Sequence, residues 1–338
     1  MTLRRYLTRR ILLALITWLG VVVAVFTLTH VLPGNPAQVR LGSFATPEAL
    51  RKLELEMGLD KPIYVQFAVY LSNLARGDLG KSFKTGQTVQ ADLVQRLPAS
   101  LELAAFSILL ATGLGVPLGL VAAVKEDSAL AQAARGLTIF GASAPLFWLG
   151  LMMIFIFFYT LRLTVPPLGR FDPLLTPPAN VTGFFTLDSL LQGDLASFRQ
   201  SLSHLVLPGA TLAIVVIAPI IKIVRASMLG VLDSDYIRTA RAIGMSLPQI
   251  IFQDALRNAL VPIVTMFGIV LGYLLAGNVI VERIFAWPGI GQYLYEAILA
   301  NDFDAIQGTV LLIAVLYVLL NLIIDVLYTF LDPRIRLG

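Results

Sequence analysis

Residues 77–82 read Gly-Asp-Leu-Gly-Lys-Ser, and residues of these types can surround the phosphates of a nucleotide. A phosphate-binding loop needs the pattern G-x-x-x-x-G-K-[ST], which opens with a glycine five residues before the second one. That position is Ala75, and no strand pattern precedes it. We therefore interpret the segment as a turn, and we expect this chain to bind neither ATP nor any other cofactor.

Residue sets for catalysis or metal binding are missing from the sequence. The chain has no cysteine, so thiolate chemistry, disulfides and Cys-ligated metal sites are excluded. No H-x-E, H-E-x-x-H or G-x-S-x-G motif stands where a membrane enzyme would need it. We expect the ionisable residues nearest the apolar segments to lie at the membrane–water interface; they are His30, Glu102, His204, Lys222, Arg225 and Asp325. A buried proton relay, as in a proton-coupled carrier, is not predicted.

The densest group of polar residues beside apolar segments is the block 235–249, which reads DYIRTARAIGMSLPQ. Ser234 or Asp235 can cap a short helix, and Gly244 stands where a helix-ending glycine belongs. Ser246 and Gln249 have the spacing of a capping box for a second helix. The block therefore predicts a short helix, a tight turn and a helix that continues into the next apolar segment.

A helix this short needs a packing partner to be stable. Ala240 and Ala242 allow close approach, and the arginines at 238 and 241 offer charge, as in a helix held in the groove of a partner protein. Tyr236, Ile237 and Met245 offer apolar contact. The alternative is a solvated linker whose arginines face lipid head groups. The residues alone favour neither interpretation.

Apolar helices must position this block. Hydrophobic residues make up 57% of the 338 residues and charged residues 14%, with a mean hydropathy of +0.81, whereas soluble domains carry roughly 25% charged residues. A spanning helix needs about 20 apolar residues, and six segments qualify: 11–32, 99–124, 136–161, 205–228, 259–281 and 305–331. Pro117, Pro145 and Pro219 predict kinks. We expect an all-α polytopic membrane protein with six transmembrane helices, folded as one domain over residues 1–338.

The distribution of positive charge predicts the orientation of these spans. One side carries 13 Lys and Arg residues. They lie in the tails 1–10 and 332–338, in the loops 125–135 and 229–258, and at the end of the span that precedes the 229–258 loop. The opposite loops, 162–204 and 282–304, carry 4. Both termini and the 229–258 loop are therefore expected in the cytoplasm. The first apolar segment is too long for a signal peptide, whose apolar region has roughly 7–15 residues, so we expect an uncleaved helix.

The outer side is expected to carry a helical cap over residues 33–98. Thr46 and Pro47 are typical of a helix start, Gly58 of its end, and a second helix should run from Pro62 to a point before Arg76. The 162–204 loop is rich in proline and is expected to be irregular.

The 282–304 loop contains an aromatic cluster followed by a turn at Trp287-Pro288-Gly289, and a short helix is predicted over 292–298. The cluster has two interpretations: a belt of aromatic residues at the membrane surface, or an outer gate beside a pore. Asn278, in the fifth predicted span, can bond a neighbouring helix or line a polar path. The candidates for a pore or gate are Asn278, Phe285, Trp287 and Pro288.

Several blocks together resemble the permease subunits of ABC importers, in the branch that serves dipeptides, oligopeptides and nickel. The family wording DY-RTARAKG followed by HALRNAL-P is similar to residues 235–244 and 254–262, with Ile243 in place of lysine and Asp254 in place of histidine. The blocks LPGNP, RGDLG, RLP with LEL, FAWPG and LDPRIR also resemble the family and begin at residues 32, 76, 96, 101, 285 and 331. The resemblance extends over nearly the whole chain.

The resemblance implies a type I ABC importer permease that forms half of a translocation pathway in a bacterial or archaeal cytoplasmic membrane. It implies a second, homologous permease subunit, two ATPase subunits that bind ATP and Mg, and an extracytoplasmic substrate-binding protein, with lipid around the spans and no nucleic acid. The 229–258 loop would couple to an ATPase through Asp235, Tyr236, Arg238, Thr239, Ala240, Arg241, Ala242, Gly244 and Met245.

Short peptides are the expected cargo, and nickel, glutathione or another small solute are alternatives within the family. From another class, an ATP-independent channel or secondary carrier is the alternative, and a membrane enzyme is a more distant one.

Overall fold

The computed structural model describes residues 3–31, 36–41 and 45–331. Over these ranges the chain is helical, and its only pairing of extended residues is an isolated bridge between Lys81 and Thr88. The all-α prediction is confirmed for this part of the chain. The C-terminal tail 332–338 and most of the blocks at 32–36 and 331–336 lie outside the described residues. Residues 3–10, expected as a tail, belong to the first helix.

Five helical segments of the described chain are long and apolar enough to cross a membrane. Four of them lie in α1 (Leu3–Val31), α5 (Val89–Val124), α9 (Leu195–Leu232) and α14 (Phe303–Leu331). The remaining one lies in a continuous helical run that consists of α11 (Leu247–Gln249), a π-helical segment (Ile250–Ala255) and α12 (Leu256–Ile284). A sixth span is obtained only if α6 (Ala129–Ser143) and α7 (Leu146–Met153) count as one.

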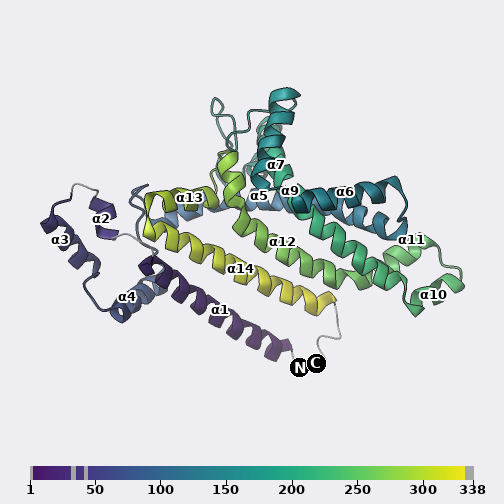
Figure 1. Ribbon diagram of the computed structural model, residues 1–338, viewed down its shortest axis with the longest axis horizontal. Coiled ribbons are helices and arrows are strands. Elements are labelled where there is room, and N and C mark those ends of the chain that lie inside the picture. The colour runs from purple at the N-terminus through teal and green to yellow at the C-terminus, as the bar shows by residue number, and fades with distance from the viewer. Residues whose placement is uncertain (1–2, 32–35, 42–44, 332–338) are drawn as a thin grey trace.

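The segment predicted as the third span is not a single kinked helix. α6 and the run that begins with α7 meet at 114°, and Figure 1 shows α7 rising away from α6. Ala144, the residue before Pro145, has extended backbone (φ −77°, ψ 128°), because the proline ring disfavours helical conformation in the residue before it. After α7 the chain continues as a π-helical segment, Ile154–Thr160.

The core lies where α5, α6 and α12 pack around α9. Glycines allow the closest approaches. A Cβ at Gly119 of α5 would lie 2.7 Å from Val224, and one at Gly141 of α6 would lie 2.4 Å from the carbonyl oxygen of Ile214. The small residues of these helices therefore serve close packing against α9.

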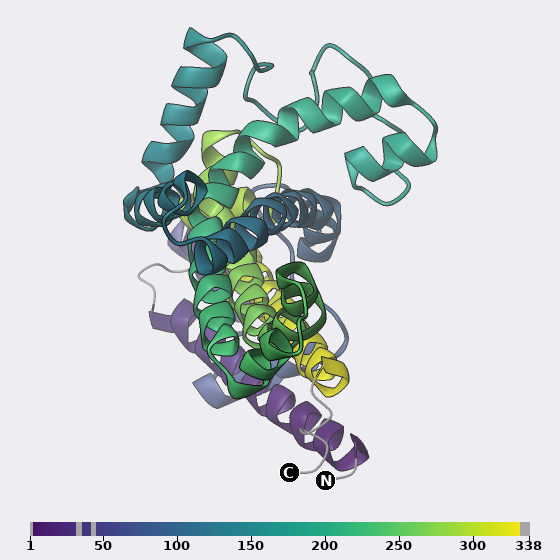
Figure 2. The same cartoon turned by 90° about the vertical axis from the view of Figure 1, so that its right-hand side faces the viewer.

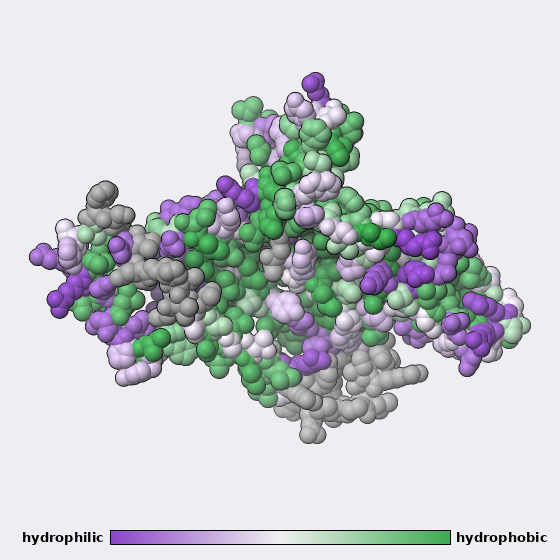
Figure 3. Space-filling model, viewed as in Figure 1, coloured by the Kyte–Doolittle hydropathy of each residue, from purple (hydrophilic) through white to green (hydrophobic). Residues whose placement is uncertain are grey.

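α1 is attached to this core through α14, and Arg10 forms an ion pair with Asp325 at 3.1 Å between these two helices. Figure 2 shows α7 and the 162–194 segment at the top, apart from α1 and α14 at the bottom. In Figure 3 hydrophilic residues gather over α3 at one end and over α10 and α11 at the other, with hydrophobic surface between them.

The two predicted basic loops lie at one end of the molecule. Arg225 of α9 donates to the carbonyl oxygen of Ala122 at 3.2 Å and forms an ion pair with Glu126 at 2.6 Å, which places the 125–128 turn beside the end of α9. α10 (Asp235–Ala242) follows α9 at this end. Figure 1 shows α13 (Ile290–Ala300) at the opposite end.

The segments predicted for the outer side are more helical than expected. α2 (Pro36–Leu41), α3 (Pro47–Met57) and α4 (Ile63–Ala75) precede α5, and α3 has the predicted caps, Thr46 at its start and Gly58, with φ +69°, after its end. Because α5 begins at Val89, the cap ends before residue 98. The 162–204 loop contains α8 (Phe185–Leu191) and the start of α9, and α13 is longer than the predicted 292–298 helix.

The segment 77–82 is a turn, as predicted. Gly80 has φ +85°, and a Cβ there would lie 2.6 Å from Asp304. Ser82 donates to Asp302 Oδ2 at 2.6 Å, and the backbone N–H of Lys81 donates to Asp304 Oδ2 at 3.3 Å. The turn therefore joins the start of α5 to the start of α14 through two carboxylates, which would repel a phosphate.

Candidate functional site

The loop of residues 229–258, which the resemblance predicts to couple to an ATPase and which we call the coupling loop for that reason, has the predicted helix–turn–helix structure. α10 ends in a Schellman motif: the N–H of Met245 donates to the carbonyl oxygen of Ala240 and that of Gly244 to Arg241, both at 3.1 Å, and Gly244 has φ +88°. The backbone N–H of Ser246 donates to Gln249 Oε1 at 2.9 Å, which completes the capping box of α11. Local capping chemistry is therefore sufficient to form this turn.

One face of α10 packs on its own chain. Ile237 and Ala240 are buried against Ile250 and contact the half-buried Met245. Ala240 was expected to allow close approach of a partner, but its side chain is only 8% exposed and lies inside the loop. Ala242 is exposed and is the alanine that a partner can reach.

The outward face of α10 consists of Asp235, Tyr236, Arg238, Thr239, Arg241 and Ala242, followed by the exposed Ile243 and Gly244. Ile243 is 74% exposed, and it was not among the residues predicted to contact an ATPase. Its exposure could have been predicted from the sequence, because a residue seven positions after Tyr236 lies on the same face of a helix. Arg238 and Asp235 form an exposed pair at 3.5 Å, and such pairs contribute about 0–1 kcal/mol.

The coupling loop is bonded to the helices on both of its sides. Ser234 Oγ donates to the carbonyl oxygen of Val231 in α9 at 2.5 Å. Asn258 Nδ2 of α12 donates to Tyr236 Oη at 3.1 Å. The π-helical segment Ile250–Ala255 lies between them in the chain and supplies Ile250 to the packing under α10. Displacement of α10 would therefore act on α9 and α12 directly.

At the opposite end of α12, the aromatic cluster lies inside the protein. Phe285 and Trp287 are each 1% exposed, and Trp287 Nε1 donates to the carbonyl oxygen of Ala99 in α5 at 2.8 Å. The interpretation as an aromatic belt on the lipid surface is therefore wrong for these two residues. Asn278 is also buried, and its Nδ2 donates to the carbonyl oxygen of Ser100 at a long 3.5 Å. Pro288 is exposed, and the gate assignment of all four residues stays a prediction.

Glu282 is the centre of this junction between α5, α12 and α13, and sequence reasoning missed it. Its side chain is 0% exposed. Ser100 Oγ donates to Oε1 at 2.5 Å, and the backbone N–H of Gln292 donates to Oε2 at 2.9 Å. A Cβ at Gly289 would lie 2.3 Å from both Glu282 Oε1 and Ser100 Oγ. The glycine after Pro288 is therefore required by a buried carboxylate as well as by the turn.

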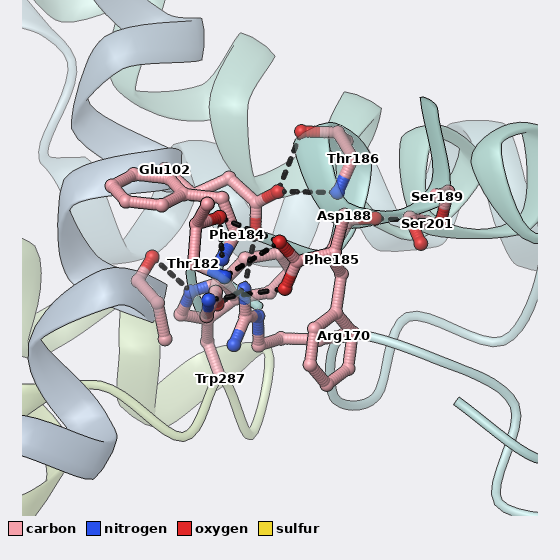
Figure 4. Close-up of polar contacts among 12 residues, drawn as sticks. Glu102, Arg170, Thr182, Phe184, Phe185, Thr186, Asp188, Ser189, Ser201 and Trp287 are labelled. Atoms are coloured by element: carbon pink, nitrogen blue, oxygen red, sulfur yellow. Dashed lines mark hydrogen bonds and ion pairs between the residues drawn. The ribbon is translucent and has the colours of Figure 1, made fainter. Parts of the chain in front are cut away.

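A second buried carboxylate, Glu102, holds the 162–194 segment against α5 (Figure 4). Arg170 Nη2 forms an ion pair with Glu102 Oε2 at 2.5 Å, and both side chains are buried. Thr186 donates its backbone N–H and its Oγ1 to Glu102 Oε1 at 2.8 and 2.6 Å. The guanidinium of Arg170 stacks on Phe185 at 3.9 Å. Glu102 is therefore buried inside the protein, where this ion pair and these hydrogen bonds replace its water; its position at the membrane–water interface stays a prediction.

Asp188 accepts four hydrogen bonds from residues 181–183 of the same segment. It accepts the N–H groups of Val181, Thr182 and Gly183 at 3.3, 2.8 and 3.0 Å, and Thr182 Oγ1 at 2.6 Å. Burial alone would raise the pKa of this carboxyl group, but these hydrogen bonds outweigh it and lower the pKa from its ordinary value. The segment is therefore folded around an ionised aspartate.

The described residues contain no group of three His, Cys, Asp or Glu side chains placed to hold a metal ion. Instead, one 29-residue helix, α12, joins an exposed short helix at one end to a buried polar junction at the other, over a length of roughly 44 Å. This arrangement suits transmission of movement along the bundle.

Comparison with known proteins shows similarity over nearly the full chain. The family described as binding-protein-dependent transport system inner membrane component matches residues 115–337, and the N-terminal region of such membrane components matches residues 3–104. The probable D,D-dipeptide transport system permease protein DdpB of Escherichia coli is 44% identical, over 94% of each chain. The dipeptide transport system permease protein DppB of Alkalihalophilus pseudofirmus is 40% identical, over 98% of this chain and 99% of its own. The di/tripeptide transport system permease protein DppB of Pseudomonas aeruginosa is 40% identical, over 98% of each chain.

Proposed function

The chain belongs to the family of binding-protein-dependent transport system inner membrane components, and from this premise we propose that it forms half of the translocation pathway of an ATP-driven importer of short peptides. It is a transport permease subunit and not an enzyme. The relatives named for dipeptides and tripeptides favour peptides over nickel chelates or glutathione as cargo.

The proposed assembly contains a second, homologous permease, two ATPase subunits that bind ATP and Mg, and a binding protein at the outer face. The chain crosses the bacterial cytoplasmic membrane six times, with α6 and α7 counted as one broken span, and has both termini in the cytoplasm. The 13 Lys and Arg residues of the predicted inner segments support this orientation.

The observation that carries the coupling role is the exposed face of α10 on a helix whose other face is fixed to its own chain. Tyr236, Thr239 and Ile243 lie on one side of the helix and are exposed. A cleft of an ATPase subunit would take this face, as a groove takes an amphipathic helix. Closure of the ATPases would displace α10, and α9 and α12 would transmit the displacement to the outer junction.

The alanine pair of α10 offers a sharp test, because the chain has no cysteine of its own. Ala242→Cys places a thiol on the exposed face, and Ala240→Cys places the same thiol on the buried face two residues away. Each variant, in the assembled transporter, is labelled with a benzophenone maleimide and irradiated. We expect a crosslink to an ATPase subunit from position 242 and none from position 240.

Asn180→Cys, at the exposed outer segment, is the control for labelling without a nearby ATPase. An ATPase crosslink from position 180, or none from position 242, would overturn the assignment of α10 and the orientation. Uptake of peptide by liposomes that contain this chain alone, without ATP, would instead support a channel or secondary carrier.

A further inference from the structure

A cavity opens beside the buried ion pair of Glu102 and Arg170. Its volume is about 580 Å³, within the range of pockets that hold small molecules. Arg96 of α5 and Arg170, Asp172 and Asn180 of the 162–194 segment line it, together with the rings of Phe171 and Phe185. The lining therefore combines groups of both charges with apolar walls.

Arg170 forms part of the wall of this cavity and is held in place by its own chain. Its Nη2 donates to Glu102 Oε2 and to the carbonyl oxygen of Gly183 at 2.8 Å. The side chain is only 7% exposed, and its charge is already paired with Glu102. The cation that a ligand can bind must therefore come from another residue of the lining.

Arg96 supplies positive charge to the lining of the cavity. Its guanidinium stacks on Tyr293 at 5.1 Å. Glu282 and Glu296 interact with its charge from a distance, but no carboxylate of the described residues forms a direct ion pair with it. Because Glu102 already pairs with Arg170, Arg96 is the cation of the lining that a ligand carboxylate can pair with directly.

Asp172 supplies the opposite charge on the same cavity. Its Oδ1 accepts the backbone N–H of Leu174 at 2.9 Å, which orients the carboxylate and leaves Oδ2 available to a cation. A ligand that satisfies the lining would thus carry an anionic and a cationic group on a small, partly apolar body.

We propose that this cavity binds a zwitterionic short peptide, with its terminal carboxylate on Arg96 and its terminal ammonium group on Asp172. The peptide's small apolar side chains would lie against Phe171 and Phe185. The proposal rests on the peptide-import function and adds a substrate site in the permease itself, separate from that of the binding protein.

The test measures which end of the peptide each residue recognises. The assembled transporter, without binding protein, is placed in lipid nanodiscs, and tritium-labelled dialanine is displaced by dialaninamide, which lacks the carboxylate, or by N-acetyl-dialanine, which lacks the ammonium group. A charge-assisted hydrogen bond contributes enough that wild type should prefer dialanine to each analogue by about 10-fold. The Arg96→Gln variant should no longer prefer dialanine to the amide but should still prefer it to the acetylated peptide. The Asp172→Asn variant should show the opposite pattern.

Arg283→Gln is the matched control, because Arg283 also stacks on a tyrosine, Tyr295 at 5.3 Å, but lies outside this cavity. It should keep both preferences. A general loss of structure would weaken all three peptides equally and would not remove one preference alone.

ATP-driven uptake of dialanine by proteoliposomes with binding protein separates the two proposals. Normal uptake combined with unchanged preferences in Arg96→Gln and Asp172→Asn would overturn the cavity proposal alone. The cavity proposal would also be overturned if Arg96→Gln weakened the affinity of the transporter for the binding protein but left both peptide preferences unchanged. Arg96 would then serve to dock the binding protein. Absence of peptide uptake by wild type would overturn the import function and the cavity proposal together.

Discussion

Asn258 Nδ2 donates a hydrogen bond to Tyr236 Oη at 3.1 Å, and this bond joins α10 to the first turn of α12. Tyr236 is also exposed on the outward face of α10. The same side chain therefore faces a partner and holds the helix that would carry the partner's movement into the membrane.

Removal of the Tyr236 hydroxyl tests this connection. Tyr236→Phe keeps the ring and loses a hydrogen bond with a net value of about 0.5–1.5 kcal/mol. We expect peptide taken up per ATP hydrolysed to fall by up to ~10-fold in proteoliposomes, while the ATPase subunits still co-purify. Tyr64→Phe, on the exposed α4, is the matched control and should leave the ratio unchanged. An unchanged ratio in Tyr236→Phe would show that this bond transmits nothing.

The turn after α10 depends on the backbone of Gly244. With φ +88° and nothing within 4 Å of a Cβ, a side chain there is limited by backbone conformation and not by space. Gly244→Val should abolish uptake while membrane insertion persists, and Gly244→Asn should be milder, because asparagine tolerates this conformation. Gly136→Val adds the same side chain in α6, also without neighbours and outside the coupling loop, and should transport normally. Normal transport by Gly244→Val would contradict the coupling role of the turn.

The buried junction at Glu282 predicts a sensitive glycine. Gly289→Ala would place a methyl group 2.3 Å from Ser100 Oγ and Glu282 Oε1, and overpacking of this kind costs about 1–3 kcal/mol. We expect the apparent melting temperature of the purified transporter to fall by several degrees, as fluorescence-detected size-exclusion chromatography after heating would show. Gly113→Ala, in α5 with nothing within 4 Å, is the control. Equal melting temperatures for the two variants would refute the tight junction.

Asp188 should govern the order of residues 179–190. Asp188→Asn turns an acceptor of four hydrogen bonds into a group with one acceptor oxygen, so some of the buried N–H donors lose their partner, at about 1–3 kcal/mol for each. Hydrogen–deuterium exchange of this segment should become faster, whereas Asp127→Asn, at an exposed turn, should leave it unchanged. If exchange in the Asp188→Asn variant were unchanged, the segment would be held in place by contacts other than those of Asp188.

The lowered pKa of Asp188 sets the direction of its pH dependence. Its stabilising effect is present above the ordinary value of 3.8 and is lost as pH falls below 3.8 through the lower folded value. Protection of residues 179–190, corrected for intrinsic exchange, should therefore be constant between about pH 5 and 8. A loss of protection within that window would point to a different titrating group.

Local patterns predicted the short-range structure well. The caps at Thr46, Gly58 and Gly244 and the box of Ser246 and Gln249 formed as expected, because a cap is decided by residues within one or two turns. The prediction was wrong where orientation mattered. Ala240 and Ala242 are the same residue type two positions apart, and only packing against Ile250 decides which of them a partner can reach.

By itself, the sequence determined the membrane class, the helical content, the capped turn of the coupling loop and the family. Composition, apolar length and local hydrogen bonding depend on near neighbours or on sums over the chain. Only the tertiary structure decided which charges are buried. Glu102 meets Arg170 across 68 residues, and Ser100 meets Glu282 across 182. Whether a carboxylate lies in water or in a protein interior depends on which distant groups the fold brings to it, and no local pattern records that pairing.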